Sequence, residues 1–370
     1  MVLARYKYRV YFTAAYVVGS SAWMKYVAPK VKPGWKRFFV VLPLLLANFM
    51  LPFLFKRKQL EELARIAAAF LIMWLSSFKI LAHCINRGPL CSDFTGKERK
   101  WSFLQFTAIL LLPLLPTEGE EVKIGDSQQV LGKQEKLKQL CRVLLMKLFC
   151  FFSVPLEMKY IPIARYSPLK DFLYTGCIYG FLGTLMDTTS LLALSLLDIR
   201  CMDNFDNPIL STSVTDMWGR RWNTMTGTLL KSISYDIVFD GQFISDKSEI
   251  GVKKRPSLMA RAMSVMAVFF FSGVMHEILF WYAAGIWGWR WFAFFMWFGP
   301  FLIIEKALKG LFRAKFGVDF NKVPFIIQNA YFWVCILLPS YLFFVPQAEM
   351  AGSTRMISQI ADSITPPRSP

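Results

Sequence analysis

Residues 260–284 read ARAMSVMAVFFFSGVMHEILFWYAA, and this stretch decides the class of fold. Its only basic, acidic or histidine side chains are Arg261, His276 and Glu277. A helix needs about 20 predominantly apolar residues to cross the hydrocarbon core of a bilayer. The stretch therefore predicts a transmembrane helix, and the histidine inside it makes the same helix a candidate for function.

The same pattern recurs along the chain of 370 residues, which is 55% hydrophobic and 18% charged, with a mean hydropathy of +0.39. Soluble domains carry about 25% charged residues. We predict an all-α polytopic integral membrane protein with eight or nine transmembrane helices, which excludes cytosolic enzymes, secreted disulfide scaffolds and disordered chains. The candidate spans are 10–24, 37–55, 62–81, 101–115, 142–155, 172–197, 260–284, 291–305 and 325–346. The short segments 10–24, 101–115 and 142–155 are also compatible with an interfacial or re-entrant position.

The charge balance is strongly basic, with 43 Lys and Arg against 25 Asp and Glu, a net charge of +18. The basic residues lie between the apolar stretches, where they flank anionic head groups and set topology. We therefore expect membrane lipids and no nucleic acid as partners. Seven cysteines without a CxxC pair indicate free thiols, and two histidines argue against a metal site.

Outside the spans, three segments differ in composition. Residues 116–141 are polar and predict a solvated connector that ends in a surface helix. Residues 198–258 carry eight Lys and Arg together with Trp and Asn, which predicts a structured cytosolic loop. We expect one membrane-embedded domain over 1–346 and a disordered tail over 347–370.

The first stretch that carries chemistry is Asp216-Met217-Trp218-Gly219-Arg220-Arg221-Trp222-Asn223. In a helix, Asp216, Arg220 and Asn223 would share one face, with Trp218 and Trp222 on another. Paired guanidinium groups beside aromatic rings can bind phosphates and an adenine ring. The alternative is an interfacial amphipathic helix with Trp anchors and snorkelling Arg side chains.

The second stretch is Ser272-Gly273-Val274-Met275-His276-Glu277. An ionisable residue inside an apolar span indicates function, and histidine is suited to accept a proton near neutral pH. The alternative is a packing histidine, and Glu277 lies about 100° further around the helix. We interpret His83 as an interfacial polar residue. Asp187 fits helix–helix hydrogen bonding and a substrate pathway equally well.

These blocks resemble the wax synthase branch of the membrane-bound O-acyltransferases (MBOAT family). Further matching blocks are Trp74-Leu75-Ser76-Ser77-Phe78-Lys79 with Gly88-Pro89-Leu90, and Asn207-Pro208 with Thr212-Ser213 and Tyr235-Asp236. The resemblance implies an MBOAT-like fold and a catalytic pair, His276 and Asn223. It also places near the acyl-CoA, or in support of the site, the side chains of Trp218, Arg220, Arg221, Trp222, Asp216 and Glu277.

The activity implied by the resemblance is transfer of a fatty acyl group from acyl-CoA to the hydroxyl of a lipophilic alcohol in the endoplasmic reticulum membrane. A long-chain fatty alcohol, giving a wax ester, is the first expectation; a sterol, diacylglycerol or terpenoid alcohol is the alternative. No cofactor or metal is expected, and a homo-oligomer is left open. From other classes, a transporter using His276 and Asp187 and a non-catalytic lipid-binding scaffold stay as hypotheses. The absence of an internal sequence repeat weighs against the transporter.

Overall fold

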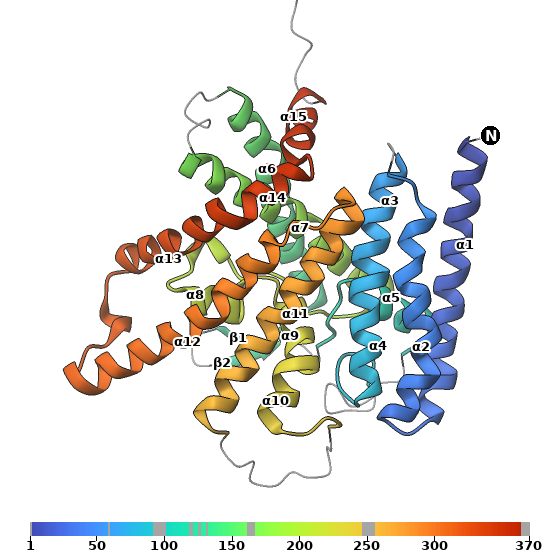
Figure 1. Cartoon of the computed structure of the whole chain (residues 1–370), viewed down its shortest axis with the longest axis horizontal. Coiled ribbons are helices and arrows are strands. Elements are labelled where there is room, and N and C mark those ends of the chain that lie inside the picture. The colour runs from blue at the N-terminus through green and yellow to red at the C-terminus, as the bar shows by residue number, and fades with distance from the viewer. Residues whose placement is uncertain are drawn as a thin grey trace, which may run out of the picture. The chain divides into compact units, whose positions relative to one another are not determined.

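The computed structural model describes residues 2–57, 60–91, 101–117, 121–124, 127–130, 132–160, 167–245 and 256–363. These residues are overwhelmingly helical (Figure 1), which confirms the predicted all-α class. The one sheet they contain is an antiparallel hairpin of β1 (Glu121–Ile124) and β2 (Ser127–Val130). The hairpin lies in the segment 116–141, for which we predicted a solvated connector that ends in a surface helix.

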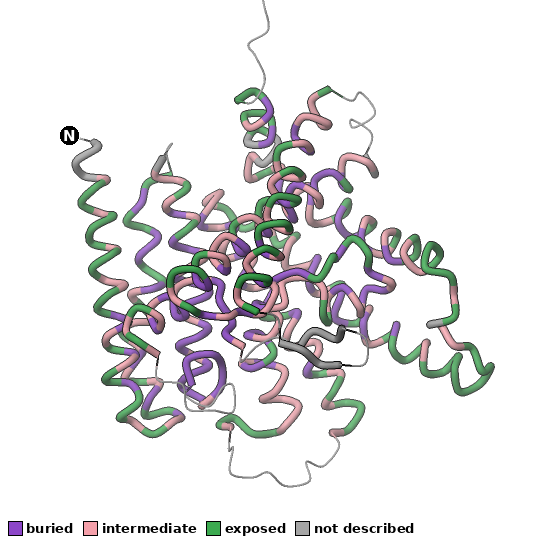
Figure 2. Tube along the Cα trace, turned by 180° about the vertical axis from the view of Figure 1, so that it is seen from behind, coloured by how far each residue is buried: buried purple, intermediate pink, exposed green. Residues whose placement is uncertain are grey.

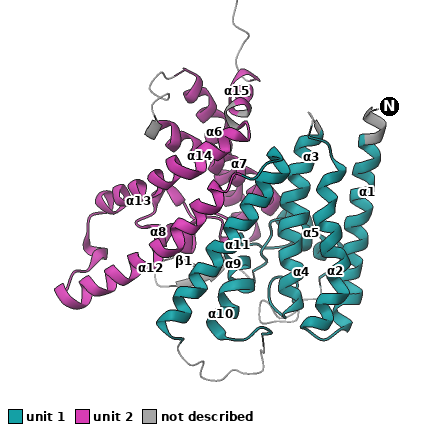
Figure 3. Ribbon diagram, viewed as in Figure 1, with its two compact units in different colours: residues 1–130, 193–202, 225–287 teal, residues 131–192, 203–224, 288–370 magenta. Residues whose placement is uncertain are grey.

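Two compact units divide the chain (Figure 3). Unit 1 comprises residues 1–130, 193–202 and 225–287, and unit 2 comprises 131–192, 203–224 and 288–370. The segment 198–258 contributes to both units. Its described residues up to 245 form short helices: α8 (Val214–Asp216), the π-helical turn η7 (Met217–Arg221), α9 (Thr224–Leu230), η8 (Lys231–Tyr235) and α10 (Asp236–Asp240).

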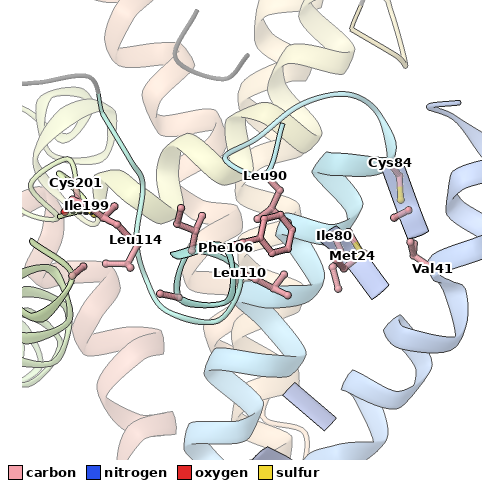
Figure 4. Packing of buried hydrophobic residues seen from close by; sticks show 14 residues of the cluster. Met24, Val41, Ile80, Cys84, Leu90, Phe106, Leu110, Leu114, Ile199 and Cys201 are labelled. Carbon is pink, nitrogen blue, oxygen red and sulfur yellow. Dashed lines mark hydrogen bonds between the residues drawn. The ribbon is translucent and has the colours of Figure 1, made fainter. Parts of the chain in front are cut away.

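Unit 1 is organised around long helices that run side by side (Figure 1). They are α1 (Val2–Ala22), α2 (Trp35–Met50), the continuous run α3 (Leu60–Ala68), η4 (Ala69–Ser76) and α4 (Ser77–Cys84), and α11 (Leu258–Ala284). The short helix α5 (Phe103–Leu111) packs its Phe106 and Leu110 into the core drawn in Figure 4. The fully buried Lys79 ammonium donates hydrogen bonds to the carbonyls of Ile109, at 2.6 Å, and Leu112, so the end of α5 is satisfied without water.

Unit 2 contains the other long helices, which are α6 (Lys133–Tyr160), α7 (Ser167–Leu197, up to residue 192), α12 (Arg290–Phe316) and α13 (Phe325–Pro339). After α13 the chain continues through η10 (Ser340–Phe344) and α14 (Val345–Met350) into α15 (Ser353–Ser363). The disordered tail that we predicted from residue 347 is therefore wrong over 347–363. Ile357 and Ala361 of α15 are buried, and α15 packs against α6. The remaining residues, 364–370, lie outside the described part.

Seven helices among the described residues are long and apolar enough to cross a membrane: 35–54, 61–84, 133–160, 169–197, 258–284, 290–316 and 325–350. The chain is thus a multi-pass membrane protein. Exposed positions follow the long helices (Figure 2), and many of them are large apolar side chains such as Phe39, Phe149 and Ile326. An apolar surface of this kind suits contact with lipid.

The predicted spans differ from these helices at three places. The span 101–115 is wrong because α5 has nine residues, about 14 Å of helix. It ends before Pro113, since the residue that precedes a proline is pushed out of the helical region. The segment 142–155 belongs to the 28-residue helix α6, and 10–24 lies in a helix that is not among the seven.

Candidate active site

His276 lies in α11 of unit 1. The helix begins after Ser257, whose hydroxyl accepts a hydrogen bond from the Ala260 amide, and it ends at Gly285 in a left-handed conformation. His276 Nδ1 is 2.7 Å from the Ser272 carbonyl oxygen. A carbonyl only accepts hydrogen bonds, so Nδ1 carries the hydrogen. In the neutral imidazole Nε2 then holds the lone pair, which is the form a general base requires.

Trp74 of η4 packs against the same imidazole. The two rings meet edge to face, with centroids 5.1 Å apart and an interplanar angle of 70°. The Trp74 side chain is buried, and its Nε1 has no hydrogen-bond partner in the described part of the chain. Met275 and Tyr282 of α11 belong to the same apolar cluster as Trp74. The sequence block 74–79 therefore contacts the histidine, a relation that we did not expect from the sequence.

Glu277 follows His276 directly and is almost fully buried, with 1% of its surface exposed. It lies about 100° further around α11, as expected from helical geometry. The structure thus places two ionisable side chains at adjacent positions of a transmembrane helix. Whether Glu277 supports the chemistry of His276 stays a prediction.

The segment 203–224 in unit 2 carries the other predicted site residues. Ser213 begins α8 by accepting a hydrogen bond from the Asp216 amide at 3.0 Å, and Asp216 Oδ2 accepts one from the Thr212 amide at 3.1 Å. The first contact caps the short helix, and the second holds the Asp216 side chain against the residue before the cap. The chain then widens into a π-helical turn, closed by the Trp222 amide donating to the Met217 carbonyl at 3.0 Å.

The π-helical turn brings both arginines to one carboxylate. Asp216 pairs with Arg220 Nε through Oδ1 and with Arg221 Nε through Oδ2, the latter at 2.7 Å. An ordinary α-helix aligns only positions three and four apart. The extra residue in the turn therefore allows the i,i+5 pair as well, and π-helical turns are frequent at functional sites.

The two arginines have different surroundings. The Arg220 side chain is 62% exposed, so its guanidinium is accessible to a ligand. The Arg221 side chain is 14% exposed, and its Nη1 donates to the Asp206 carbonyl at 3.0 Å. Arg221 thus ties the turn to the chain that precedes it, whereas Arg220 faces outward.

The Asp216 carboxyl is strongly influenced by these contacts. Burial raises its pKa, but hydrogen bonds from the Arg220 side chain, the Thr212 backbone and the Arg221 side chain together outweigh burial and hold the pKa below its usual range. Asp216 is therefore ionised at neutral pH and balances one of the two guanidinium charges.

Asn223 leaves the helix instead of continuing it. Trp222 is extended and Asn223 has a φ of 43°, in the left-handed region that asparagine tolerates. The prediction that Asn223 shares a helical face with Asp216 and Arg220 is therefore wrong, because the turn ends at Arg221. The Thr224 amide then donates to the Asn204 carbonyl at 2.9 Å and starts α9.

The two tryptophans belong to separate aromatic groups rather than to one face. Trp218 packs on Phe298 and Phe295 of α12, with ring centroids 5.3 and 5.8 Å away. Trp222 packs on Phe205, with centroids 5.2 Å apart. Both rings hold the segment within unit 2, so neither is simply an interfacial anchor.

Two residues that hold this segment escaped the sequence analysis. Glu305 of α12 accepts hydrogen bonds from Thr215, and Asn329 Nδ2 of α13 donates to the carbonyls of Ile209 and Ser211, each at 2.9 Å. A signal for Glu305 existed, since it is an acidic residue inside an apolar helix. The predicted span ended at Glu305, whereas α12 continues to Phe316.

The remaining ionisable candidates, Asp187 and His83, make contacts within the protein interior. Asp187 forms a buried ion pair with Lys147 of α6, which favours a helix–helix role. A Cβ at Gly183 would come within 2.6 Å of Lys147 Cδ, so the glycine makes room for this lysine. His83 is buried rather than interfacial, with Nδ1 3.8 Å from Cys91 Sγ.

Comparison with known proteins places these residues in context. Residues 201–298 match the model of the membrane bound O-acyl transferase family. The chain is 25% identical over 337 residues to an acyl-CoA–sterol O-acyltransferase of Arabidopsis thaliana, covering 90% of this chain and 88% of that protein. It is also 25% identical to a long-chain-alcohol O-fatty-acyltransferase of Simmondsia chinensis, covering 80% of this chain and 80% of that protein. A probable long-chain-alcohol O-fatty-acyltransferase of Arabidopsis thaliana is likewise 25% identical, covering 85% of this chain and 84% of that protein.

The matched region runs from the start of the segment 203–224 through α11 into α12, so it contains every predicted site residue. The similarities confirm the resemblance inferred from the sequence blocks, and with it the prediction of an O-acyltransferase.

Proposed function

Given this relationship to the membrane bound O-acyl transferase family, we propose that the chain transfers a fatty acyl group from acyl-CoA to a long-chain fatty alcohol and so forms a wax ester. The observation that carries the proposal is the fixed imidazole of His276 in an apolar span, with Nδ1 hydrogen-bonded to Ser272. The similarity to long-chain-alcohol O-fatty-acyltransferases over most of the chain supports the substrate class.

In the proposed reaction, His276 Nε2 takes the proton of the alcohol while the alcohol oxygen attacks the thioester carbonyl. The C–S bond then breaks, and the imidazolium returns the proton to the departing thiolate, which leaves as CoA. General-base assistance of this kind contributes about 10²–10⁴-fold in rate. Asn223 is the proposed hydrogen-bond donor to the carbonyl oxygen, a contribution of roughly 3 kcal/mol in a dry site.

Acyl-CoA also has a highly charged head group. We propose that Arg220 contacts its phosphates, because the guanidinium is exposed and lies on a turn held by Asp216. Arg221 supports the turn through the Asp206 carbonyl instead. No cofactor other than the acyl-CoA substrate takes part in this scheme, and the proposed location is the endoplasmic reticulum membrane.

A sterol acceptor is the second candidate, because the sterol O-acyltransferase of Arabidopsis thaliana is similar over 90% of this chain. The deciding experiment expresses the chain in a host that lacks neutral-lipid acyltransferases. Its microsomes receive labelled acyl-CoA together with a fatty alcohol, a sterol, a diacylglycerol or a terpenoid alcohol.

A labelled wax ester with the fatty alcohol as the best acceptor is the expected result. If another alcohol is the best acceptor, the proposed acceptor is wrong but the proposed acyl transfer stands. If folded protein forms no ester with any of these alcohols, the proposed acyl transfer is wrong and the transporter and scaffold hypotheses are favoured.

A further inference from the structure

Glu305 is a buried carboxylate directly after the uncharged stretch 291–304 of α12. It lies in α12, which is one of the seven helices able to span a membrane, and only 4% of its surface is exposed. Burying an ionisable side chain at such a place costs free energy unless partners compensate. The proposed acyl transfer does not use Glu305 directly, so its contacts need another explanation.

Both hydrogen bonds that Glu305 Oε2 accepts come from Thr215, in the segment 203–224. Oε2 accepts a hydrogen bond from the Thr215 amide at 2.9 Å and one from the Thr215 hydroxyl at 2.5 Å. Lys309, one turn along α12, places its ammonium 3.4 Å from Oε1. One carboxylate oxygen thus holds both donors of Thr215 in α8, directly before Asp216.

A second contact fixes the same segment to the same helix. Trp218 packs on Phe298, which lies seven residues before Glu305 in α12. Positions seven apart lie on one face of an α-helix. One face of α12 therefore contacts the segment on both sides of Asp216, through Thr215 and through Trp218.

We propose that Glu305 is a positioning residue for the acyl-CoA: through Thr215 it fixes α8 and the π-helical turn, and so sets where Asp216 presents the Arg220 guanidinium. This inference rests on the proposed function. It differs from a purely structural role, because it assigns Glu305 an effect on one substrate only.

The test compares apparent KM values for palmitoyl-CoA and for the alcohol in purified variants. Glu305→Leu removes the acceptor and should raise the KM for palmitoyl-CoA about tenfold, the usual effect of losing a hydrogen bond to a charged group, with the alcohol KM unchanged. Glu305→Gln keeps an oxygen that can accept from Thr215 and should stay within about threefold of the wild type. Thr215→Val should follow Glu305→Leu in direction, and Thr215→Ser should behave as wild type.

The control is Lys306→Leu, which changes the exposed neighbour of Glu305 and should alter neither KM. In the double variant Glu305→Leu/Thr215→Val the effects should not add, because both substitutions remove the same contact. Palmitoyl-CoA binding, measured as thermal stabilisation of the detergent-extracted protein, gives a second readout that needs no turnover.

The outcomes separate the two proposals. If wild-type protein forms ester but Glu305→Leu and Thr215→Val change both KM values alike or neither, the role of Glu305 is refuted and the acyltransferase stands. If wild-type protein neither forms ester nor binds palmitoyl-CoA, the proposed function fails and takes the role of Glu305 with it. If Glu305→Leu does not fold, the comparison of the palmitoyl-CoA KM in Thr215→Val and Thr215→Ser decides whether the contact positions the turn.

Discussion

At the scale of single residues, His276 carries the strongest prediction. His276→Ala removes the proposed proton acceptor, so ester formation should fall by about 10²-fold or more while palmitoyl-CoA binding persists. The measurement is turnover per folded molecule after size-exclusion chromatography in detergent. The chain offers one matched control, His83→Gln, which alters the other histidine and should keep near-normal turnover. Near-normal turnover in His276→Ala would remove the catalytic assignment.

Trp74 gives a second prediction at this scale. Its ring meets His276 edge to face at 5.1 Å, and such a contact contributes about 0.5–1.5 kcal/mol. Trp74→Phe replaces the indole by a smaller phenyl ring and so weakens the contact with His276. It should lower kcat about two- to tenfold while both KM values stay constant. Trp23→Phe, at a 41% exposed tryptophan elsewhere in unit 1, is the control. A higher KM with unchanged kcat would contradict an effect on the imidazole.

The sequence could identify His276 and could not identify Trp74. A histidine inside an apolar span stands out because its position is costly. A tryptophan in another apolar span does not, since its role depends on which two helices pack together, and the sequence spacing of 74 and 276 carries no such information. The direction of Asn223 could not be predicted either, because the chain around it is held by hydrogen bonds of Arg221 with Asp206 and of Thr224 with Asn204, which lie some 15 to 20 residues earlier.

At the scale of elements, the turn around Asp216 predicts a pH dependence. The pKa of the Asp216 carboxyl is lower in the folded than in the unfolded protein, where it is about 3.9. Its stabilising contribution is therefore present above pH 4 and is lost as the pH falls further, through the folded pKa. Asp216→Asn should lower the melting temperature at pH 7, and the difference from wild type should shrink below about pH 4. A difference that is constant from pH 7 to pH 3.5 would show that ionisation is unimportant.

The control for this element is Asp319→Asn. Asp319 pairs with Arg313, whose side chain is 66% exposed, at 3.1 Å. Exposed ion pairs contribute about 0–1 kcal/mol, so this variant should melt close to wild type at every pH.

Helix α15 carries the next prediction. Ile357 is buried in a cluster that contains Val154 of α6 and Tyr174 of α7, and burying such a side chain contributes about 1.5–3 kcal/mol. Ile357→Asp replaces this with an unpaired charge and should lower the melting temperature clearly. Gln359→Asp introduces the same charge at an exposed position of α15 and should change it little. Equal melting temperatures for the two variants would mean that α15 is not docked.

The long helices could be predicted because their apolar residues are continuous. The short helices could not, because their limits depend on single residues and on packing partners. The long helices agree with the hydropathy because a span needs about 20 apolar residues. Helix α5 was extended too far, since the apolar run continues through Leu112 while Pro113 ends the helix. Helix α15 was missed because eleven residues that alternate Ser, Gln and Asp with Ile and Ala resemble a polar tail until a partner surface is known.

At the scale of the whole molecule, the sequence predicted a multi-pass membrane protein but not its two units. Hydropathy counts helices one at a time, whereas each unit is assembled from three separate segments. The boundary between units passes twice through 198–258, so that Asn223 belongs to unit 2 and Met225 to unit 1. Such an exchange depends on long-range packing, which composition does not record.

The last prediction concerns topology and follows from α11. Its 27 residues measure about 40 Å, enough to place its two ends on opposite faces of the membrane. Gln242 follows α10, which packs against α11, and its carbonyl accepts a hydrogen bond from Arg87 at 3.1 Å. Ile286 lies just beyond the other end of α11 and is 47% exposed. The predicted cytosolic side is that of Gln242, where basic residues and the CoA head group are expected.

Single cysteines at Gln242 and Ile286 test this orientation in sealed microsomes with the cytosolic face outward. Of the seven native cysteines, all in the described part of the chain, only Cys141 is exposed, so both variants are made in a Cys141→Ser background. A membrane-impermeant maleimide should label Gln242→Cys directly and Ile286→Cys only after the membrane is permeabilised. The reverse pattern would place the Gln242 end of α11 in the lumen and would contradict the predicted orientation. Labelling of both sites in sealed vesicles would show that α11 does not cross the membrane, and the assignment of His276 to the bilayer interior would fall with it.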